Sequence, residues 1–413
     1  MTTAMFWRRN ILSNGLRVLL FPRESANTAQ LSIAVEYGSN QELPEIAGVA
    51  HFLEHMLAGG STKRIQLSQS IEDSGGILNL YTDKEHMMSM MDVLPEKLTE
   101  ASFVISELLF NNDFEEEKFR KERKIIINEL AEASDDPCER VEELLLKSLF
   151  KNHPVKRPVG GFPKTVKQLT LDQLSKAQST NYVPQNMVLV LAGNFSEKNC
   201  ELVLKNFENK AAAKAFSKKI YPLETGIPEP LVIKRKSGMT QSYLRIGART
   251  VCSNHKDAAT LDLISALLSA GTSSRLFVEL RENNALTYDV NSEHNKGLDF
   301  GYFSIDCAVK DKNLVKAKDL ILKELSKLKM EKVPISELER NKNLITAEIL
   351  RGMDNPHELS EILAYMEIQF KSENSLIDYV GKIKAVSAEN ILEAANAYFQ
   401  EDCLSTVILK PKE

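Results

Sequence analysis

The sequence predicts an α+β fold with two homologous α/β sandwich domains, in which helices cover mixed β-sheets. Two observations lead to this prediction. Short apolar strands alternate with helices along the chain, and the second half repeats features of the first. The chain has 413 residues, which is enough for about two to four domains. Its residues are 43% hydrophobic and 26% charged, an ordinary composition for a globular protein.

The first half contains the clearest strand and helix patterns. Alternating apolar residues flank Asn14-Gly15, a pair typical of a type I′ hairpin turn. Apolar residues at helical spacing predict a helix over 46–57. Thr170 and Gln173 form a capping box that opens another helix. Further strands are expected at 16–21, 31–37, 77–82, 87–94 and 187–191, and further helices at 96–110, 114–133 and 138–150.

An internal repeat predicts how the domains are divided. Shifted by 211 positions, residues 56–64 align with 267–275; shifted by 217 positions, residues 166–174 align with 383–391. Two matches in the same order at similar offsets indicate an internal duplication rather than chance similarity. The segment between the copies has no clear period and contains prolines, as linkers do. We therefore expect domains at 1–207 and 230–413, joined by a linker at 208–229.

Composition and charge argue against several classes of protein. The net charge of −5 disfavours nucleic acid as a partner, since phosphate binding needs a basic face. No apolar run reaches the roughly 18 residues of a membrane helix, and residues 1–15 lack an apolar core of signal-peptide length. Five scattered cysteines without a CxxC pair argue against a disulfide framework and a thiolate zinc site. We expect a cytoplasmic protein that binds no membrane.

The stretch HFLEH at 51–55 carries the most specific chemistry. His51 and His55 are four residues apart, so in a helix both imidazoles lie on one face and can bind one ion. Glu54 lies close enough to act as a general base, and H-x-x-E-H is a signature of zinc peptidases. The alternative is a core helix that holds two hydrogen-bonded histidines. At an offset of 211, His51 aligns with Asp262 and His55 with Ala266, so the second copy packs this helix without histidines, which favours the metal site.

A third ligand is expected from a separate element. The charged helix over 114–133 offers Glu122, Glu129 and Glu132, although a run of charges is usually a solvated helix face. Residues 125–127 are three isoleucines, which indicates that the helix enters the core near Glu129. Glu122 and Glu129 are seven residues apart and share a face, so one could bind the metal while the other holds a histidine or a water molecule. Spacing alone does not decide between them.

Further motifs extend this pattern along most of the chain, and together they resemble the family of pitrilysin, insulin-degrading enzyme and the mitochondrial processing peptidase. The match is to the short, two-domain prokaryotic type. The motifs are LSNGLRV (12–18), GVAHFLEHML (48–57), GG…NLYT (75–82) with EH (85–86), HP (153–154), YVPQNM (182–187), GN (193–194) and SSRLFVELRENNALTY (273–288).

The resemblance implies a role for each candidate residue. His51, His55 and Glu129 would bind one zinc ion per chain, Glu54 would be the general base, and Glu122 would be an accessory glutamate. The segment around Asn79 would be an edge strand to which an extended peptide adds. Arg281 would grip the substrate backbone, and Tyr288 would stabilise the scissile carbonyl as charge develops. Without the resemblance, Asn79 is equally well an ordinary edge-strand residue, Arg281 a surface arginine and Tyr288 a half-buried strand tyrosine.

The resemblance also implies an assembly and an activity. We expect a zinc metalloendopeptidase that cuts peptides or unfolded chains in a chamber formed on dimerisation, where the zinc site of one subunit faces Arg281 and Tyr288 of the other. A heterodimer with a homologous subunit is the alternative assembly. A non-catalytic structural or partner subunit is the alternative function, and the retained His51, Glu54, His55 and Glu129 argue against it. His86 and His153 are expected to make structural hydrogen bonds.

Overall fold

The computed structural model describes residues 7–212, 218–372 and 375–412. The chain divides into two compact units, and each unit takes segments from both halves of the sequence. Unit 1 consists of Met1–Ala131, Arg157–Lys219 and Arg351–Ser375. Unit 2 consists of Glu132–Lys156, Ile220–Leu350 and Leu376–Glu413.

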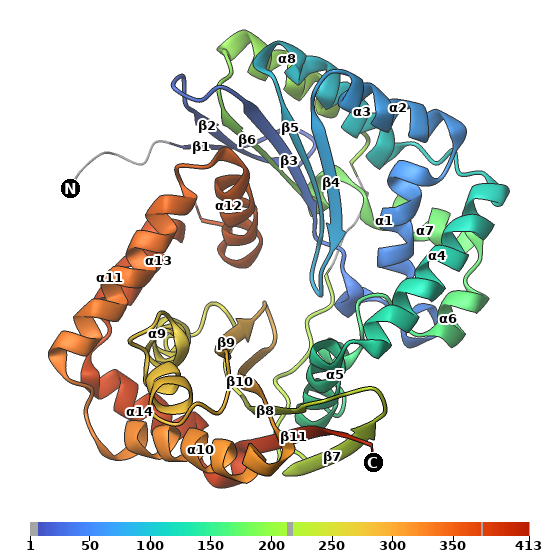
Figure 1. Ribbon diagram of the computed structural model, residues 1–413. Helices are drawn as coiled ribbons and strands as arrows, with labels where there is room; N and C mark the ends of the chain where they lie inside the picture. Colours follow the sequence, from blue (N-terminus) through green and yellow to red (C-terminus); the bar gives the residue numbers. More distant parts are fainter. Residues whose placement is uncertain (1–6, 213–217, 373–374, 413) are drawn as a thin grey trace. The chain divides into compact units, whose positions relative to one another are not determined.

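Unit 1 is built on a six-stranded mixed sheet (Figure 1). The strands lie in the order β1 (Arg8–Ile11), β2 (Arg17–Pro22), β6 (Met187–Gly193), β3 (Ala29–Val35), β5 (Met87–Val93) and β4 (Ile77–Thr82). Strands β2 and β6 are parallel, and all other neighbours are antiparallel. β4 is therefore an edge strand, and its last residue is Thr82.

Helices cover both faces of this sheet. Alternation along β3 turns Leu31 and Ile33 to the apolar core shared with α1 and α3, while Ser32 faces α12 and hydrogen-bonds Ser360 at 2.8 Å. The helices of this unit are α1 (Val49–Gly59), α2 (Thr62–Asp73), α3 (Leu98–Phe110), α4 (Glu116–Asp135, whose last residues belong to unit 2), α6 (Pro163–Gln168), α7 (Leu171–Asn181), α8 (Glu197–Glu208) and α12 (Pro356–Phe370).

Unit 2 is built on a five-stranded mixed sheet. The strands lie in the order β7 (Leu231–Lys236), β11 (Leu404–Pro411), β8 (Ser242–Arg249), β10 (Gly301–Val309) and β9 (Val290–Lys296). Helix α5 (Pro137–Leu149) packs on β8 and β11, and α9 (Ala258–Ser269) packs on β9. The remaining α-helices are α10 (Leu314–Met330), α11 (Ile335–Gly352, whose last two residues belong to unit 1), α13 (Ser375–Ala385, whose first residue belongs to unit 1) and α14 (Ala388–Tyr398), and a short π-helix spans Phe277–Glu282.

The two sheets share one topology. A parallel pair, β2–β6 or β7–β11, is followed in each sheet by three antiparallel neighbours that end in an edge strand, β4 or β9. The predicted fold class, two similar sandwiches with mixed sheets covered by helices, is thus confirmed. The predicted domains at 1–207 and 230–413, with a linker at 208–229, stay a prediction. The compact units are divided differently, because α5 from the first half of the chain belongs to unit 2 and α12 from the second half belongs to unit 1. Part of the expected linker, 213–217, lies outside the described residues.

The hairpin at Asn14-Gly15 forms with a different turn from the one predicted. Gly15 has a φ of +88°, but Asn14 is not among the residues with positive φ, as a type I′ turn would require. Instead, the side chain of Asn14 makes two hydrogen bonds. Its Nδ2 donates to the backbone carbonyl of Phe207 at 2.8 Å, and its Oδ1 accepts from the backbone N–H of Leu16 at 3.2 Å. The prediction of a type I′ turn is therefore wrong, because Asn14 ties the loop to the end of α8.

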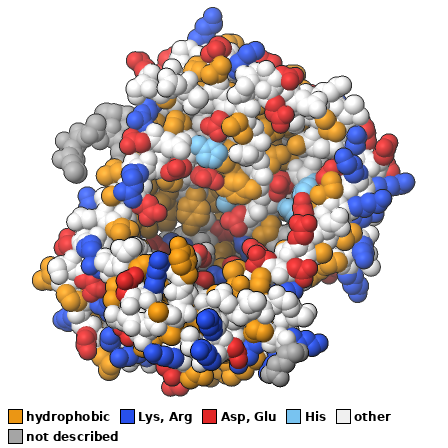
Figure 2. Space-filling model, in the orientation of Figure 1, with side chains coloured by type: hydrophobic (Ala, Val, Ile, Leu, Met, Phe, Trp, Pro, Cys, Tyr) orange, Lys and Arg blue, Asp and Glu red, His pale blue; other side chains and the backbone are white. Residues whose placement is uncertain are grey.

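Charges of both signs are interspersed over the face of the molecule shown in Figure 2. Within the described residues, no helix has both the length and the apolar character needed to cross a membrane.

Candidate metal centre

The candidate centre is built on α1, whose N-terminus is held by a buried carboxylate. Oε2 of Glu42 accepts from the backbone of Gly48 at 2.9 Å, and Oε1 accepts from Ala50 at 2.8 Å. These bonds satisfy two amides that a helix start leaves unpaired. Gly48 has a φ of +97°, and a Cβ there would lie 2.5 Å from the carbonyl oxygen of Gly160, so the tight entry to α1 requires glycine.

Apolar packing directs the two histidines towards α4. Phe52 and Met56 of α1 are fully buried in the core, and Phe52 stacks on Phe119 of α4 with ring centroids 4.8 Å apart. His51 and His55 lie on an adjacent face of α1, also beside α4, and are partly exposed. The same packing of α4 brings Glu122 and Glu129 beside them, since these residues lie on one face of that helix.

His51, His55 and Glu129 form a compact cluster of metal-binding atoms. Oε2 of Glu129 lies 3.3 Å from Nε2 of His55 and 3.9 Å from Nε2 of His51. One ligand atom from each of the three residues lies within 4.8 Å of the others. Donor atoms around a tetrahedral zinc ion are about 3.4 Å apart, so two imidazoles and this carboxylate fit such an ion with small adjustments.

Glu122 occupies a different place from Glu129. Its Oε2 lies 3.2 Å from Nδ1 of His55, on the opposite edge of the ring from Glu129. This arrangement lets Nδ1–H donate to Glu122 and turns the lone pair of Nε2 towards the cluster, as is usual for metal-binding histidines. Glu132, the third candidate considered on this helix, is exposed and lies outside the cluster.

Burial and charge set the protonation of the two histidines. Burial, together with the neighbouring His55, lowers the pKa of His51 to about 4. At neutral pH His51 is therefore a neutral imidazole, the form that binds a metal. Burial opposes the charged form of His55, but the hydrogen bond to Glu122 and the charges of Glu129 and Glu54 raise its pKa overall. A cation at the cluster would take the place of that proton.

Glu54 lies between the cluster and the edge of the sheet. Oγ1 of Thr82, at the end of β4, donates to Oε2 of Glu54 at 2.8 Å. Burial raises the pKa of Glu54, while the hydrogen bond from Thr82 and the charge of His55 oppose that rise. A carboxylate with a raised pKa beside a metal site is suited to accept a proton.

The other predicted residues occupy different places in the two units. Asn79 lies on edge strand β4 of unit 1 with an exposed side chain, and it pairs across the ladder with Met90. Arg281 and Tyr288 belong to unit 2 and contact each other. The guanidinium of Arg281 lies 4.4 Å from the centre of the Tyr288 ring, and its Nη1 donates to the Tyr288 carbonyl at 3.0 Å.

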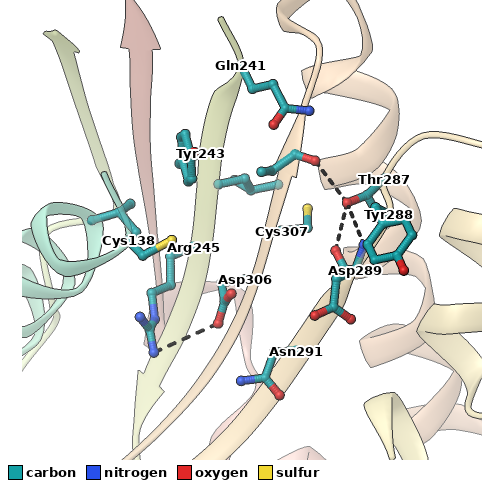
Figure 3. A pocket seen from close by; sticks show the side chains of 13 residues that line it. Cys138, Gln241, Tyr243, Arg245, Thr287, Tyr288, Asp289, Asn291, Asp306 and Cys307 are labelled. Atoms are coloured by element: carbon teal, nitrogen blue, oxygen red, sulfur yellow. Dashed lines mark hydrogen bonds and ion pairs between the residues drawn. The ribbon is translucent and has the colours of Figure 1, made fainter. Parts of the chain in front are cut away.

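The side chain of Tyr288 is more exposed than expected for a tyrosine on a strand. It is 81% exposed in the loop before β9, so the half-buried strand tyrosine expected without the resemblance is wrong. It borders a cavity of about 230 Å³ in unit 2 (Figure 3). Residues that line this cavity include Cys138, Tyr243, Arg245, Thr287, Asp289 and Asp306.

The remaining candidate histidines are not part of a metal cluster among the described residues. His153 is buried, and its Nε2 lies 3.1 Å from Asp299 while its Nδ1 accepts from the backbone of Val155 at 3.0 Å. It therefore makes the structural hydrogen bonds expected of it. His86 is also buried, and its ring packs edge-on against Tyr81.

Sequence reasoning missed three residues that shape the site. Thr82 lies inside the NLYT motif, which pointed to the strand but to no role for its hydroxyl. Glu42 gave no signal, because it caps α1 from six residues upstream of Gly48 across an intervening turn. Gly160 packs against the imidazole of His51, where a Cβ would lie 3.4 Å from Nδ1, and its only signal was the Gly160-Gly161 pair.

Comparisons with known proteins identify the family of this chain. The family described as Insulinase (Peptidase family M16) matches residues 17–161, and the Peptidase M16 inactive domain matches 168–345. An uncharacterized zinc protease of Bacillus subtilis is 27% identical, and one of Rickettsia bellii is 28% identical, each alignment covering 96% of both chains. A solved structure of a protease from Helicobacter pylori shares the fold, with a TM-score of 0.91, 23% identity and coverage of 98% of this chain and 99% of that one. The chain belongs to peptidase family M16.

Proposed function

We propose that this protein is a zinc-dependent metalloendopeptidase that hydrolyses peptides or unfolded chains bound in extended form. The observation that carries the proposal is the cluster of His51, His55 and Glu129, with the Glu54 carboxylate beside it. Relatives that match this chain over nearly its full length are named zinc proteases, which supports the same metal.

The chain's own residues divide the work. His51 and His55 would offer Nε2 and Glu129 a carboxylate oxygen to one zinc ion per chain, and Glu122 would hold the ring of His55. Zinc in such a site supplies a Lewis acid that activates water. Glu54 would accept the proton of the attacking water at its carboxylate and deliver it to the leaving amine.

Substrate binding would use an edge strand and two residues of unit 2. Strand β4 presents an unpaired edge, and an extended peptide could add to it by backbone hydrogen bonds near Asn79. Arg281 would grip the substrate backbone. The exposed hydroxyl of Tyr288 would stabilise charge on the scissile carbonyl.

We propose a homodimer as the working assembly, in which the zinc site of one subunit meets the partner subunit's Arg281 and Tyr288. The sequence carries both sets of residues, so two identical chains would be self-sufficient. A heterodimer with a homologous chain is the alternative.

A non-catalytic subunit of the same fold is the competing function. The inactive-domain match covers 168–345, whereas His51, Glu54, His55 and Glu129 all lie within the other match, 17–161. The inactive-domain match therefore does not cover the proposed metal ligands and general base, whereas it does cover Arg281 and Tyr288.

The test is zinc per chain, measured by elemental analysis, together with cleavage of a quenched fluorescent peptide, for wild type and Glu54→Gln. We expect about one zinc in both and chelator-sensitive cleavage by wild type alone, since removal of a general base costs about 10²- to 10⁴-fold. Zinc without cleavage by wild type would favour a metal-bearing partner subunit. Absence of zinc after metal loading would favour the structural subunit.

A further inference from the structure

Thr82 joins the proposed general base to the proposed substrate strand. Its Oγ1 donates to Oε2 of Glu54 at 2.8 Å. Thr82 is the only residue that hydrogen-bonds the Glu54 carboxylate within the described parts of the chain, through its hydroxyl and also through its backbone, and only the hydroxyl bond depends on the side chain. It is also the last residue of β4, three positions after Asn79.

We propose that Thr82 is a positioning residue that holds the Glu54 carboxylate in its reactive orientation and in register with peptide bound along β4. This role rests on the proposed function, in which Glu54 is the base and β4 receives the substrate. Thr82 acts through Glu54 and requires no contact with the substrate or the metal.

The geometry gives a physical reason for the role. Glu54 lies on α1 and reaches the cluster through a flexible side chain, so an unrestrained carboxylate would sample several rotamers. The threonine hydroxyl engages one oxygen and leaves further lone pairs of the carboxylate for water. Reacting groups must be held close to the productive geometry, and small misplacements cost large factors in rate.

The position of Thr82 in the sheet links this restraint to the substrate. Thr82 pairs with Met87, and Asn79 with Met90, in the antiparallel ladder between β4 and β5. A peptide added to the free edge of β4 would take its register from the same strand. Through Thr82, the Glu54 carboxylate would therefore be held at a fixed position along β4, the same strand that sets the register of the bound peptide. Without this contact, only α1 would position Glu54.

A purely structural role for Thr82 makes a different prediction. Threonine is a good strand residue because it is β-branched, and valine has the same shape and β-propensity without the hydroxyl. If only the shape of Thr82 matters, Thr82→Val will behave as wild type. If the hydroxyl matters, Thr82→Ser will retain function and Thr82→Val will not.

The experiment compares Thr82→Val, Thr82→Ser and wild type by kcat, KM, zinc per chain and melting temperature. We expect Thr82→Val to lower kcat about 10- to 100-fold, the usual cost of losing a supporting hydrogen bond at such a site, with KM, zinc content and melting temperature near wild type. Thr82→Ser should restore most of kcat. In a crystal structure of metal-free Thr82→Val, the Glu54 carboxylate should be displaced, whereas in Thr82→Ser it should keep its place.

A matched control is available in the same unit. Thr62 on α2 donates its hydroxyl to Glu115 at 3.3 Å on the surface, so Thr62→Val removes a threonine–glutamate hydrogen bond without touching Glu54. It should leave kcat unchanged. A wild-type kcat in Thr82→Val, or equal losses in the serine and valine variants, would overturn the positioning role while the proposed function stands. Failure of wild type to cleave in a chelator-sensitive way would overturn both.

Discussion

Nδ1 of His55 lies 3.2 Å from Oε2 of Glu122, while Nε2 of the same ring lies 3.3 Å from Oε2 of Glu129. The imidazole of His55 therefore lies between Glu122 and Glu129, which are seven residues apart on α4. In its neutral form the ring can donate to Glu122 from Nδ1 and keep the lone pair of Nε2 for a metal ion bound beside Glu129. This relationship assigns different proposed roles to two residues of the same type.

Glu122→Gln should weaken zinc binding without abolishing it. The change removes the negative charge that fixes the orientation and basicity of His55, and the loss of such a partner typically costs about 10- to 100-fold in metal affinity. Competition with a chromophoric chelator measures the affinity directly. Glu132→Gln on the same helix is the control, because Glu132 is exposed and should leave the affinity unchanged. Equal affinities for wild type and Glu122→Gln would show that Glu122 does not support the ligand.

The separation of Glu122 and Glu129 also marks the limit of sequence reasoning at this site. Helical periodicity placed His51 and His55 on one face of a helix, and α1 confirms it. The same periodicity left the two glutamates equivalent, because residues seven apart share a face. Which glutamate meets which edge of His55 depends on how α4 packs against α1, and the stacking of Phe52 on Phe119 is one contact of that packing.

The fold shows the same division between local and distant contacts. Local signals such as the Thr170–Gln173 capping box are present as predicted. The position of α12 was not predictable in this way: its residues 356–370 belong to the second half of the sequence, yet the helix packs on β3 and β6 of unit 1. Its polar contacts, such as Ser360 with Ser32, do not stand out in a helical pattern. Long-range pairing of this kind leaves no periodic trace in the sequence.

Compared with wild type, Asp306→Asn should be relatively more stable at neutral pH than at acidic pH. Burial raises the pKa of Asp306 to about 6; Arg245 opposes this, and the carboxylates of Glu293, Glu142 and Asp289 add to it. The folded state therefore binds this proton more tightly than the unfolded state. The stabilising contribution is complete below the unfolded pKa of about 4 and is lost as pH rises through about 6.

Denaturant unfolding at pH 4 and pH 7.5 measures this effect. From pH 4 to pH 7.5, the free energy of unfolding of wild type should decrease by about 1 kcal/mol relative to that of Asp306→Asn. This figure allows for solvent screening of a partly exposed side chain. Asp319→Asn, at an exposed site on α10, should follow wild type at both pH values. A difference between wild type and Asp306→Asn that does not depend on pH would contradict the expected titration.

His153→Ala should destabilise unit 2 without loss of metal. The imidazole of His153 pairs with Asp299 at 3.1 Å, and Asp299 also accepts from the backbone of Tyr221 at 2.7 Å. Truncation leaves a buried carboxylate short of one hydrogen-bond partner, which costs about 1–3 kcal/mol. Calorimetry should show a lower melting temperature, with about one zinc still bound per chain. His255→Ala, at a partly exposed histidine, is the control, and loss of zinc from His153→Ala alone would identify His153 as a ligand after all.

Tyr288→Phe should lower kcat and leave zinc in place. The exposed hydroxyl of Tyr288 is proposed to stabilise the developing oxyanion, and loss of one such donor costs about 10²- to 10³-fold in kcat. Tyr243→Phe is the matched control, since Tyr243 lines the same cavity of unit 2 (Figure 3) without a proposed role. Equal kcat values for Tyr288→Phe and wild type would remove Tyr288 from the mechanism.

Mixing two inactive variants should restore activity if each active site is shared between two subunits. In a heterodimer of Glu54→Gln and Tyr288→Phe, one site combines both defects, while the other combines an intact Glu54 with the partner subunit's intact Tyr288. Random exchange makes half of the dimers mixed, each with one working site, so an equimolar mixture should recover about a quarter of wild-type activity in a symmetric dimer. Sedimentation of the mixture checks that dimers are present. A mixture no more active than the average of the two separate variants would show that Glu54 and Tyr288 act within one chain.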